Sequence, residues 1–376
     1  MFNISDVLHQ RAAAEKVPLS GTFELSPVCN FSCKMCYVRK TPAQICREGK
    51  SIIPMEGWLA LAEECRRAGT LFLLLTGGEP FLYPGFRELY TRLHRMGFVL
   101  YLNTNGTLID EETVEWLKQN APGRVNITLY GSSPETYRRI CGDPAGYEKA
   151  LRAIRMLKQA QIPVVINASM IPENEADLED ILSVGEELEL NVRMSTYMFP
   201  PVRREKEQSD SRFTPEQAAG IFLRKAKRQY GGQIYRDLLA QYQKCGGCFS
   251  GEGEDWGEGE DYMRCRAGRS SFWVSWEGIM TACGLMDFPL KTFPFEDGFL
   301  PSWLALTERV RTTPVLSGCS GCDKRELCRP CAAMTYAETG SAAEKASYLC
   351  QMADHILAHV SREIHCIGRD DHETEV

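Results

Sequence analysis

Three cysteines lie close together in one short polar segment near the N-terminus. The stretch CNFSCKMC places Cys29, Cys33 and Cys36 with C-x3-C-x2-C spacing, directly after GTFEL. Thiolate is the usual protein ligand of iron–sulfur clusters, and a cubane 4Fe–4S cluster has four irons to be held. Three cysteines would hold three irons and leave the fourth open to a ligand from outside the protein. A zinc site completed by a distant residue, or a chance grouping, is the alternative that this spacing leaves open.

The composition of the whole chain favours metal ligation over disulfide bonds. The 376 residues include sixteen cysteines. The net charge of -7 separately argues against nucleic-acid or anionic-membrane partners. The N-terminus has no apolar run of signal-peptide length, and no segment of about 20 apolar residues follows. We therefore expect a cytoplasmic protein without a membrane partner. Cytosolic thiols are kept reduced, so cluster or metal ligation is the leading use of so many cysteines.

The first half of the chain alternates predicted strands with predicted helices. The strand segments begin with GTFEL and the apolar run LFLLLTGG, which is typical of a buried parallel strand. Six strand–helix units fit between GTFEL and RMSTYMF, two short of a closed eight-fold barrel. We therefore predict an α/β fold with a partial (β/α)6 TIM-like barrel. The predicted strand segments are 21–25, 70–76, 98–106, 124–133, 162–170 and 191–199, and the helical segments are 56–69, 85–97, 110–120, 146–160 and 174–188.

The polar motifs of this half all fall at the carboxyl ends of predicted strands. They are the cysteine loop, TGGEP, NTNG, YGSS, NAS and STY. Parallel βα barrels carry their chemistry at that end. The shared position predicts one site at the mouth of the barrel.

The cysteine loop, followed one strand later by GGEP, resembles the radical S-adenosylmethionine (SAM) superfamily. The resemblance implies that the amino and carboxylate groups of SAM bind the open iron. It also implies that GGEP binds the SAM ammonium, through Gly77, Gly78, Glu79 and Pro80. Glycines allow close backbone approach, and a carboxylate suits an ammonium neighbour. Met35 departs from the superfamily pattern, which has an aromatic residue before the third cysteine.

Further SAM contacts are expected from the same strand ends. Ser132 and Ser133 begin a helix whose N–H groups can hold the SAM carboxylate, although plain N-caps need no ligand. Arg138 or Arg139 would pair with that carboxylate, with a solvated helix face as the alternative. Asn105 and Asn167 are expected ribose contacts.

The second half of the chain, from about residue 231, changes character. A Gly- and acid-rich loop is followed by a predicted hairpin with its turn at Glu277-Gly278, and then by CSGCDKRELCRPC. Its two C-x2-C pairs are too close together for a zinc ribbon, and the thiols exceed one tetrahedral site. We expect this half to be loop-rich, with few long apolar elements. Its cysteine order resembles the SPASM extension, which carries two auxiliary 4Fe–4S clusters.

The SPASM resemblance implies three 4Fe–4S clusters in all. The cysteines of its two auxiliary clusters, I and II, are interleaved along the sequence. A fourth ligand of cluster I is expected from Cys248 in preference to Cys245. The domains expected are an N-terminal extension (1–20), the barrel (21–235) and a SPASM-like domain with a C-terminal helix (236–376). Cys46, Cys65, Cys141 and Cys366 remain as structural buried thiols, with a hydrogen-atom donor role as an alternative for Cys141. Cluster I is assigned Cys265, Cys283 and Cys331, and cluster II is assigned Cys319, Cys322, Cys328 and Cys350.

The resemblance implies an enzyme that generates a 5′-deoxyadenosyl radical and abstracts a hydrogen atom. We expect a ribosomally made peptide as substrate, crosslinked or oxidised, with a small-molecule substrate as the alternative. Cys283 is followed by Gly284, with Asp287 further along, which disfavours sulfatase maturation. Fewer than 30 residues precede the cysteine loop, so a leader-binding domain is expected to be absent and a separate leader-peptide-binding protein is an expected partner. A flavodoxin or ferredoxin would donate electrons. A non-catalytic iron–sulfur protein and a zinc-bound interaction module are the alternatives from other classes.

Overall fold

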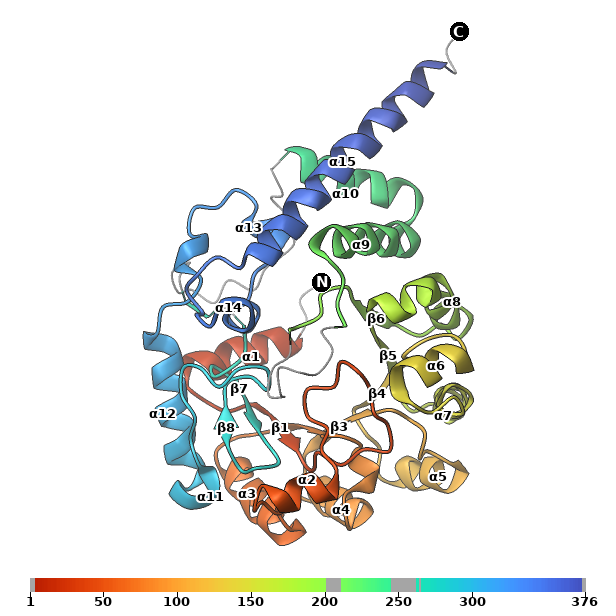
Figure 1. Cartoon of the computed structure of the whole chain (residues 1–376). Coiled ribbons are helices and arrows are strands. Elements are labelled where there is room, and N and C mark those ends of the chain that lie inside the picture. The colour runs from red at the N-terminus through yellow and green to blue at the C-terminus, as the bar shows by residue number, and fades with distance from the viewer. Residues whose placement is uncertain (1–3, 201–210, 245–261, 264, 374–376) are drawn as a thin grey trace.

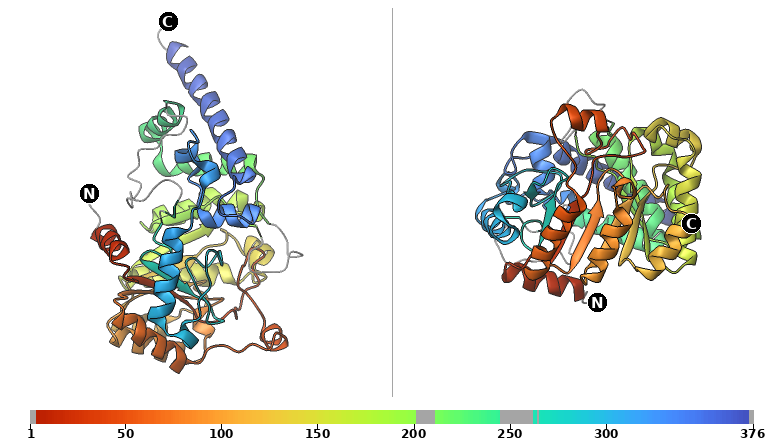
Figure 2. Two further views of the ribbon diagram at one scale, coloured as in Figure 1. Left: turned by 90° about the vertical axis from the view of Figure 1, so that its left-hand side faces the viewer. Right: turned by 90° about the horizontal axis from the view of Figure 1, so that it is seen from below.

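One eight-stranded sheet organises the chain in the computed structural model, which describes residues 4–200, 211–244, 262–263 and 265–373. The strand order is β6-β5-β4-β3-β2-β1-β7-β8, and the sheet curves into an open barrel (Figure 1; Figure 2, right). The strands are β1 (Ser20–Glu24), β2 (Phe72–Thr76), β3 (Val99–Thr104), β4 (Arg124–Thr128), β5 (Val164–Ser169), β6 (Val192–Ser195), β7 (Ser271–Val274) and β8 (Met280–Thr281).

Strands β1 to β6 are all parallel, which confirms the predicted partial barrel. The predicted hairpin is also confirmed, as the antiparallel pair β7–β8, with Gly278 at a φ of +82° in its turn. The position of this hairpin in the barrel sheet was not predicted. Strand β7 pairs in parallel with β1, with Ser20 opposite Ser271, and so extends the barrel sheet. The hairpin that carries Cys283 is therefore part of the same sheet as the cysteine loop.

Helices cover the outer face of this sheet. Residues 4–14, predicted only as an extension, form α1. The helices are α1 (Ile4–Ala14), α2 (Pro42–Arg47), α3 (Met55–Arg67), α4 (Phe86–Arg95), α5 (Glu111–Gln119), α6 (Pro134–Cys141), α7 (Gly146–Gln159), α8 (Leu178–Glu187), α9 (Pro215–Tyr230), α10 (Gly232–Lys244), α11 (Pro294–Asp297), α12 (Phe299–Thr312), α13 (Arg325–Cys328), α14 (Ala332–Thr339) and α15 (Ser347–Glu373), with 3-10 turns η1 (Pro80–Leu82), η2 (Pro172–Asp177) and η3 (Ser317–Cys319).

The second half contains the expected C-terminal helix, α15, and a further long helix, α12, that its loop-rich sequence did not predict. Helix α12 covers the outer face of β7, where Phe272 packs against Phe299 and Trp303 with ring centroids 4.9 and 6.2 Å apart. Helices α9, α10 and α15 share a second core, and α15 projects from the molecule beyond them (Figure 1; Figure 2, left). The domain boundary expected at residue 235 falls inside α10. No helix in the described ranges combines the length and apolarity needed to cross a membrane.

A buried ion pair fastens α14 to the end of the barrel. The Arg212 guanidinium donates to both oxygens of Glu338, at 2.8 and 3.1 Å, and Tyr197 donates to the same carboxylate at 2.8 Å. Both charged side chains are largely buried, with 13% and 10% of their surfaces exposed. The guanidinium also lies over the ring of Tyr348, 4.2 Å from its centroid. One charged group thus joins the segment after β6, α14 and α15.

We expect Glu338→Ala to lower the free energy of unfolding by about 3 kcal/mol, because it leaves the Arg212 charge buried without its partner. Urea unfolding of the cluster-loaded protein measures this loss. Glu115→Ala is the matched control, since Glu115 pairs with Lys118 on an exposed face of α5 and such pairs contribute less than about 1 kcal/mol. Equal effects of the two changes would contradict a role for the buried pair.

Candidate functional site

The cysteine loop leaves β1 and is fixed at its start by the GGEP loop. The Gly78 N–H donates to the Ser26 carbonyl at 2.7 Å, and the Glu79 N–H donates to the Val28 carbonyl at 2.9 Å. A Cβ on Gly78 would lie 2.3 Å from the Val28 carbonyl oxygen. The two backbones can approach this closely only because a glycine is present. The first cysteine and the GGEP loop therefore hold a fixed position relative to each other.

Main-chain N–H groups in the same loop point at the cysteine sulfurs. The Phe31 N–H donates to Cys29 Sγ at 3.4 Å, and the Arg39 N–H donates to Cys36 Sγ at 3.3 Å. From the NTNG loop, the side-chain amide nitrogen of Asn105 also lies 3.8 Å from Cys29 Sγ. Donors of this kind stabilise metal-bound thiolates and orient them.

The donor set fits a cluster with several irons. Burial, with smaller contributions from Glu79 and the other two thiols, raises the pKa of Cys29 to about 12. Binding to a metal would displace that proton. Within the described part of the chain, no three His, Cys, Asp or Glu side chains converge on a single ion position. Three thiols spread over one loop suit a cubane, whose irons lie at separate corners, better than one zinc ion.

Glu79 is fully buried and bonded to protein donors. Its carboxylate accepts from the Thr104 hydroxyl at 2.8 and 2.9 Å, from the Asn105 N–H at 2.9 Å and from the Phe81 N–H at 3.2 Å. The Asn105 amide in turn donates to Asn30, beside Cys29, at 2.9 Å. Glu79 thus joins the GGEP loop to the NTNG loop. In this position the carboxylate holds the backbone of both loops.

The YGSS segment is positioned by a residue that sequence reasoning missed. Asp177 accepts from the Ser132 N–H at 2.7 Å, from the Ser132 hydroxyl at 2.5 Å and from Thr136. Ser133 caps α6 by accepting from the Thr136 N–H at 3.2 Å. Asp177 lies in the turn before α8, and its spacing gave no sign of this contact.

Three further residues predicted to contact SAM, Asn167, Arg138 and Arg139, differ in burial and in their hydrogen-bond partners. Asn167 lies in β5 and is half-buried, next to the strand that ends at the YGSS segment. Arg138 pairs with Glu135 at 2.9 Å and is 61% exposed, as the solvated-face alternative expected. Arg139 donates to the Glu173 carbonyl. Of these three, Asn167 alone lies in the barrel sheet.

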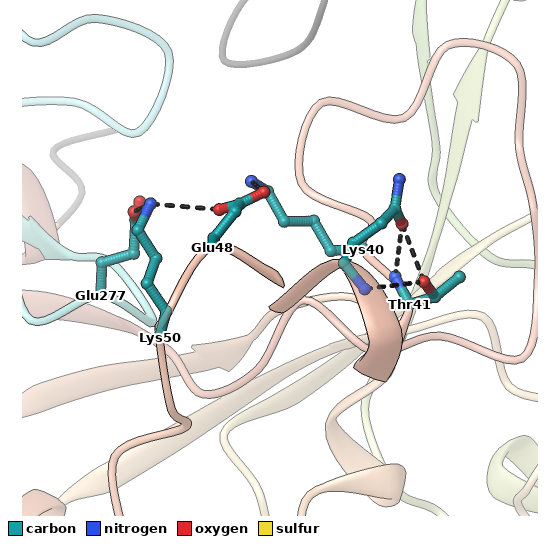
Figure 3. A network of polar contacts seen from close by, with 6 residues as sticks. Lys40, Thr41, Glu48, Lys50 and Glu277 are labelled. Atoms are coloured by element: carbon teal, nitrogen blue, oxygen red, sulfur yellow. Dashed lines mark hydrogen bonds and ion pairs between the residues drawn. The ribbon is translucent and has the colours of Figure 1, made fainter. Parts of the chain in front are cut away.

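A charged network joins the end of the cysteine loop to the hairpin turn (Figure 3). Lys50 pairs with Glu48 at 3.2 Å and with Glu277 at 2.5 Å, and Lys40 pairs with Glu48. Both ammonium groups lie about 6 Å above the buried ring of Trp276, at 6.0 and 5.7 Å from its centroid. Segment 40–50 is therefore held against the strand pair that leads to Cys283.

The cysteines of the second half form two groups. Cys283 is close enough to Cys265 and Cys331 for their charges to interact, and burial raises the pKa of Cys283 to about 11. The second group surrounds one cavity of about 480 Å³. Its thiols are Cys319, Cys322, Cys328 and Cys350. The structure thus places together the thiols assigned to each auxiliary cluster.

The other cysteines differ in exposure. Cys245, Cys248 and Cys366 carry no described side chain. The expectation that Cys46 is buried is wrong, because it lies exposed on α2. Cys65 and Cys141 are buried, with 0% and 1% of their surfaces exposed. The hydrogen-atom donor role of Cys141 stays a prediction.

Burial raises the pKa of Glu79 to about 7, so the folded protein holds a proton there that the unfolded chain releases at lower pH. The stability contributed by this proton is present at low pH and is lost as the pH rises to about 7. Relative to Glu79→Gln, the wild type should therefore lose about 2 kcal/mol between about pH 5.5 and 7. Unfolding of both proteins at each pH measures the difference. A difference that does not change with pH would contradict the raised pKa.

Comparison with known proteins supports this geometry. Residues 23–184 match the family model of the radical SAM superfamily. The AdoMet-dependent heme synthase of Methanosarcina barkeri is 24% identical over 348 residues, which cover 89% of this chain and 97% of that protein. Sporulation killing factor maturation protein SkfB of Bacillus subtilis is 26% identical over 286 residues, 73% of this chain and 62% of SkfB. The chain thus matches less than two thirds of SkfB.

The fold is shared with a solved structure, native anSMEcpe with bound AdoMet and Cp18Cys peptide. The TM-score is 0.65 at 19% identity, over 94% of this chain and 99% of that one. The match covers the barrel and the C-terminal extension together. Residues 23–184, in which the cysteine loop is held against GGEP, thus carry a radical SAM domain, of the superfamily that binds SAM and a 4Fe–4S cluster.

Proposed function

We propose that this enzyme abstracts a hydrogen atom from a peptide, with the first cluster on Cys29, Cys33 and Cys36. The observation that carries the proposal is the pair of backbone hydrogen bonds that hold the three-cysteine loop against GGEP at the barrel mouth. When bound there, the cluster and SAM supply the 5′-deoxyadenosyl radical chemistry.

The residues of the chain bind and orient these groups. The backbone of Gly77 and Gly78, which packs against the Ser26 and Val28 carbonyls because neither residue has a side chain, would contact the SAM ammonium. Glu79 and Thr104 fix the loop that carries Asn105, and Asn105 and Asn167 contact the ribose. We assign no SAM carboxylate contact to the α6 N-terminus, because Ser132 already donates to the Asp177 carboxylate and Ser133 caps the helix.

Two auxiliary 4Fe–4S clusters belong to the proposal. Cluster I would take Cys283 and its two neighbours, with Cys248 as the fourth ligand, and cluster II would fill the 480 Å³ cavity lined by four thiols. Hairpin β7–β8 brings cluster I to the edge of the barrel sheet. When bound there by these thiols, the cluster would supply an electron acceptor for oxidation of the substrate. A flavodoxin or ferredoxin would reduce the first cluster.

The peptide substrate is supported by a cavity next to the cysteine loop. The cavity has a volume of about 520 Å³ and includes Tyr37, Trp273, Trp276 and Tyr336 in its lining. SkfB is named a sporulation killing factor maturation protein, and the anSMEcpe structure contains a bound peptide. A separate protein would bind any leader peptide.

A small carboxylate substrate is the second candidate function. A neighbouring cavity of about 630 Å³, which Cys283 also lines, contains Arg124, Arg193 and Arg266. Arg266 pairs with Asp6. Arg124 stacks on the ring of Tyr101. Burial, together with the charge of Arg193, lowers the pKa of Arg124. Two cations that repel each other favour an anionic ligand. The similarity to a heme synthase agrees with this candidate.

We expect the anaerobically reconstituted chain to hold about twelve irons, as three cubanes require. Replacing Cys29, Cys33 and Cys36 together with Ala should remove about four of them and abolish 5′-deoxyadenosine formation under dithionite. Iron analysis and chromatography of the products measure both effects. Cys65→Ala is the control, because Cys65 is buried in α3 away from the loop. Persistent SAM cleavage in the triple variant would sink the site assignment.

The auxiliary assignment is tested by Cys322→Ala combined with Cys328→Ala. Because metal binding contributes directly to the folding of cluster domains, we expect insoluble protein or a loss of about four irons. Cys46→Ala, at an exposed thiol, should leave solubility and iron unchanged. If the double variant is soluble, with full iron content and normal turnover, cluster II is not where we place it.

A further inference from the structure

Strand β6 lies at one edge of the sheet and has a row of backbone groups without a neighbouring strand. In the described part of the chain it pairs with β5 alone. The Asn191 carbonyl accepts from the Ile166 N–H of β5 at 3.0 Å. Because backbone groups alternate in direction along a strand, the N–H and C=O groups of Val192 and Met194 point away from β5. Such an edge is a template for one more strand.

A groove runs along this edge, between β6 and α9. Figure 1 shows α9 beside α8, beyond the edge of the sheet. The groove has a volume of about 900 Å³ and is lined by all of β6. Two side chains of α9 reach the strand. Gln229 donates to the Val192 carbonyl at 3.2 Å, and Lys225 donates to the Met194 carbonyl at 2.8 Å. They occupy the places that the N–H groups of another strand would take.

The groove carries positive charge that its own carboxylates do not balance. Both glutamates that line it, Glu186 and Glu189, already form ion pairs with basic residues of α9 and α7. Lys225 and Arg193 line it as well, and neither pairs with a carboxylate of the described chain. Burial lowers the pKa of Lys225, and no carboxylate raises it in return. An anionic ligand would complement both side chains.

We propose that the free edge of β6 binds an extended, acidic segment of the peptide substrate as an additional strand. The inference rests on the peptide substrate proposed above. The N–H groups of the segment would replace the two α9 side chains at the edge carbonyls. The released Lys225 would then pair with a carboxylate of the segment. Backbone hydrogen bonds supply the affinity of such strand addition, and pockets for alternate side chains supply its selectivity.

Arg193 joins this groove to the barrel. Its side chain also lines the 630 Å³ cavity that includes Cys283. Side chains of neighbouring strands lie side by side on the same face of a sheet, so an acidic residue of the added strand meets Arg193 on the barrel side. A peptide held on β6 thus borders the cavity inside the barrel.

The test measures binding of a defined probe to the reconstituted holoenzyme. The probe is a short fluorescein-labelled peptide of alternating valine and glutamate, and fluorescence anisotropy gives its affinity. We expect Lys225→Met and Arg193→Gln each to weaken binding about tenfold, because a charge-assisted hydrogen bond is lost. Lys227→Met is the matched control on the same helix. It should leave the affinity unchanged, since Lys227 pairs with Glu363 and does not line the groove.

A second probe tests backbone pairing without any change to the protein. The same peptide, N-methylated at two successive central residues, is blocked on both of its edges and should bind at least about tenfold more weakly. Equal affinities of the two peptides, an unchanged affinity in Lys225→Met, or no binding of the unmodified peptide would overturn the proposal. A dimer in sedimentation that Lys225→Met dissociates would assign the edge to a second copy of the chain and would contradict it too. A wild type that binds the probe but forms no 5′-deoxyadenosine would instead contradict the proposed function, so the two failures are distinguishable.

Discussion

Two backbone hydrogen bonds between the ends of β1 and β2 determine the geometry of the whole site. They join the start of the cysteine loop to Gly78 and Glu79 at 2.7 and 2.9 Å. Adjacent parallel strands end at the same edge of the sheet, so their loops meet without a long connection. The glycine removes the side chain that would separate them. A ligand that touches both loops therefore meets a site that is already formed.

The same edge of the sheet explains how the second half of the chain reaches the site. Strand β7 continues the barrel next to β1, and Lys50 pairs with Glu277 in the hairpin turn. The Arg212–Glu338 pair fixes α14, the helix that Cys331 caps, to the segment after β6. One attachment holds the hairpin that leads to Cys283, and the other holds the helix that Cys331 caps. These contacts fix the region assigned to auxiliary cluster I relative to the barrel.

The sequence was sufficient to predict the barrel because its signals are local. Apolar runs such as LFLLL mark single strands, and the polar residues that follow mark their carboxyl ends. The pairing of β7 with β1 joins residues about 250 positions apart, and no local pattern specifies it. The same holds for Asp177, which is separated from Ser132 along the chain by α6, α7 and β5. Glu79 was predicted from its motif, but its burial depends on Thr104 in the next strand.

The central claim is that three cysteines leave one iron of the first cluster open to SAM. Mössbauer spectroscopy of the ⁵⁷Fe-reconstituted enzyme tests it most directly, because it resolves irons by their coordination. Addition of SAM should shift the signal of one iron in about twelve. Binding of the SAM amino and carboxylate groups to that iron would account for the shift. If no iron responds to SAM while all clusters are present, the fourth position is already occupied and the account of the site is wrong.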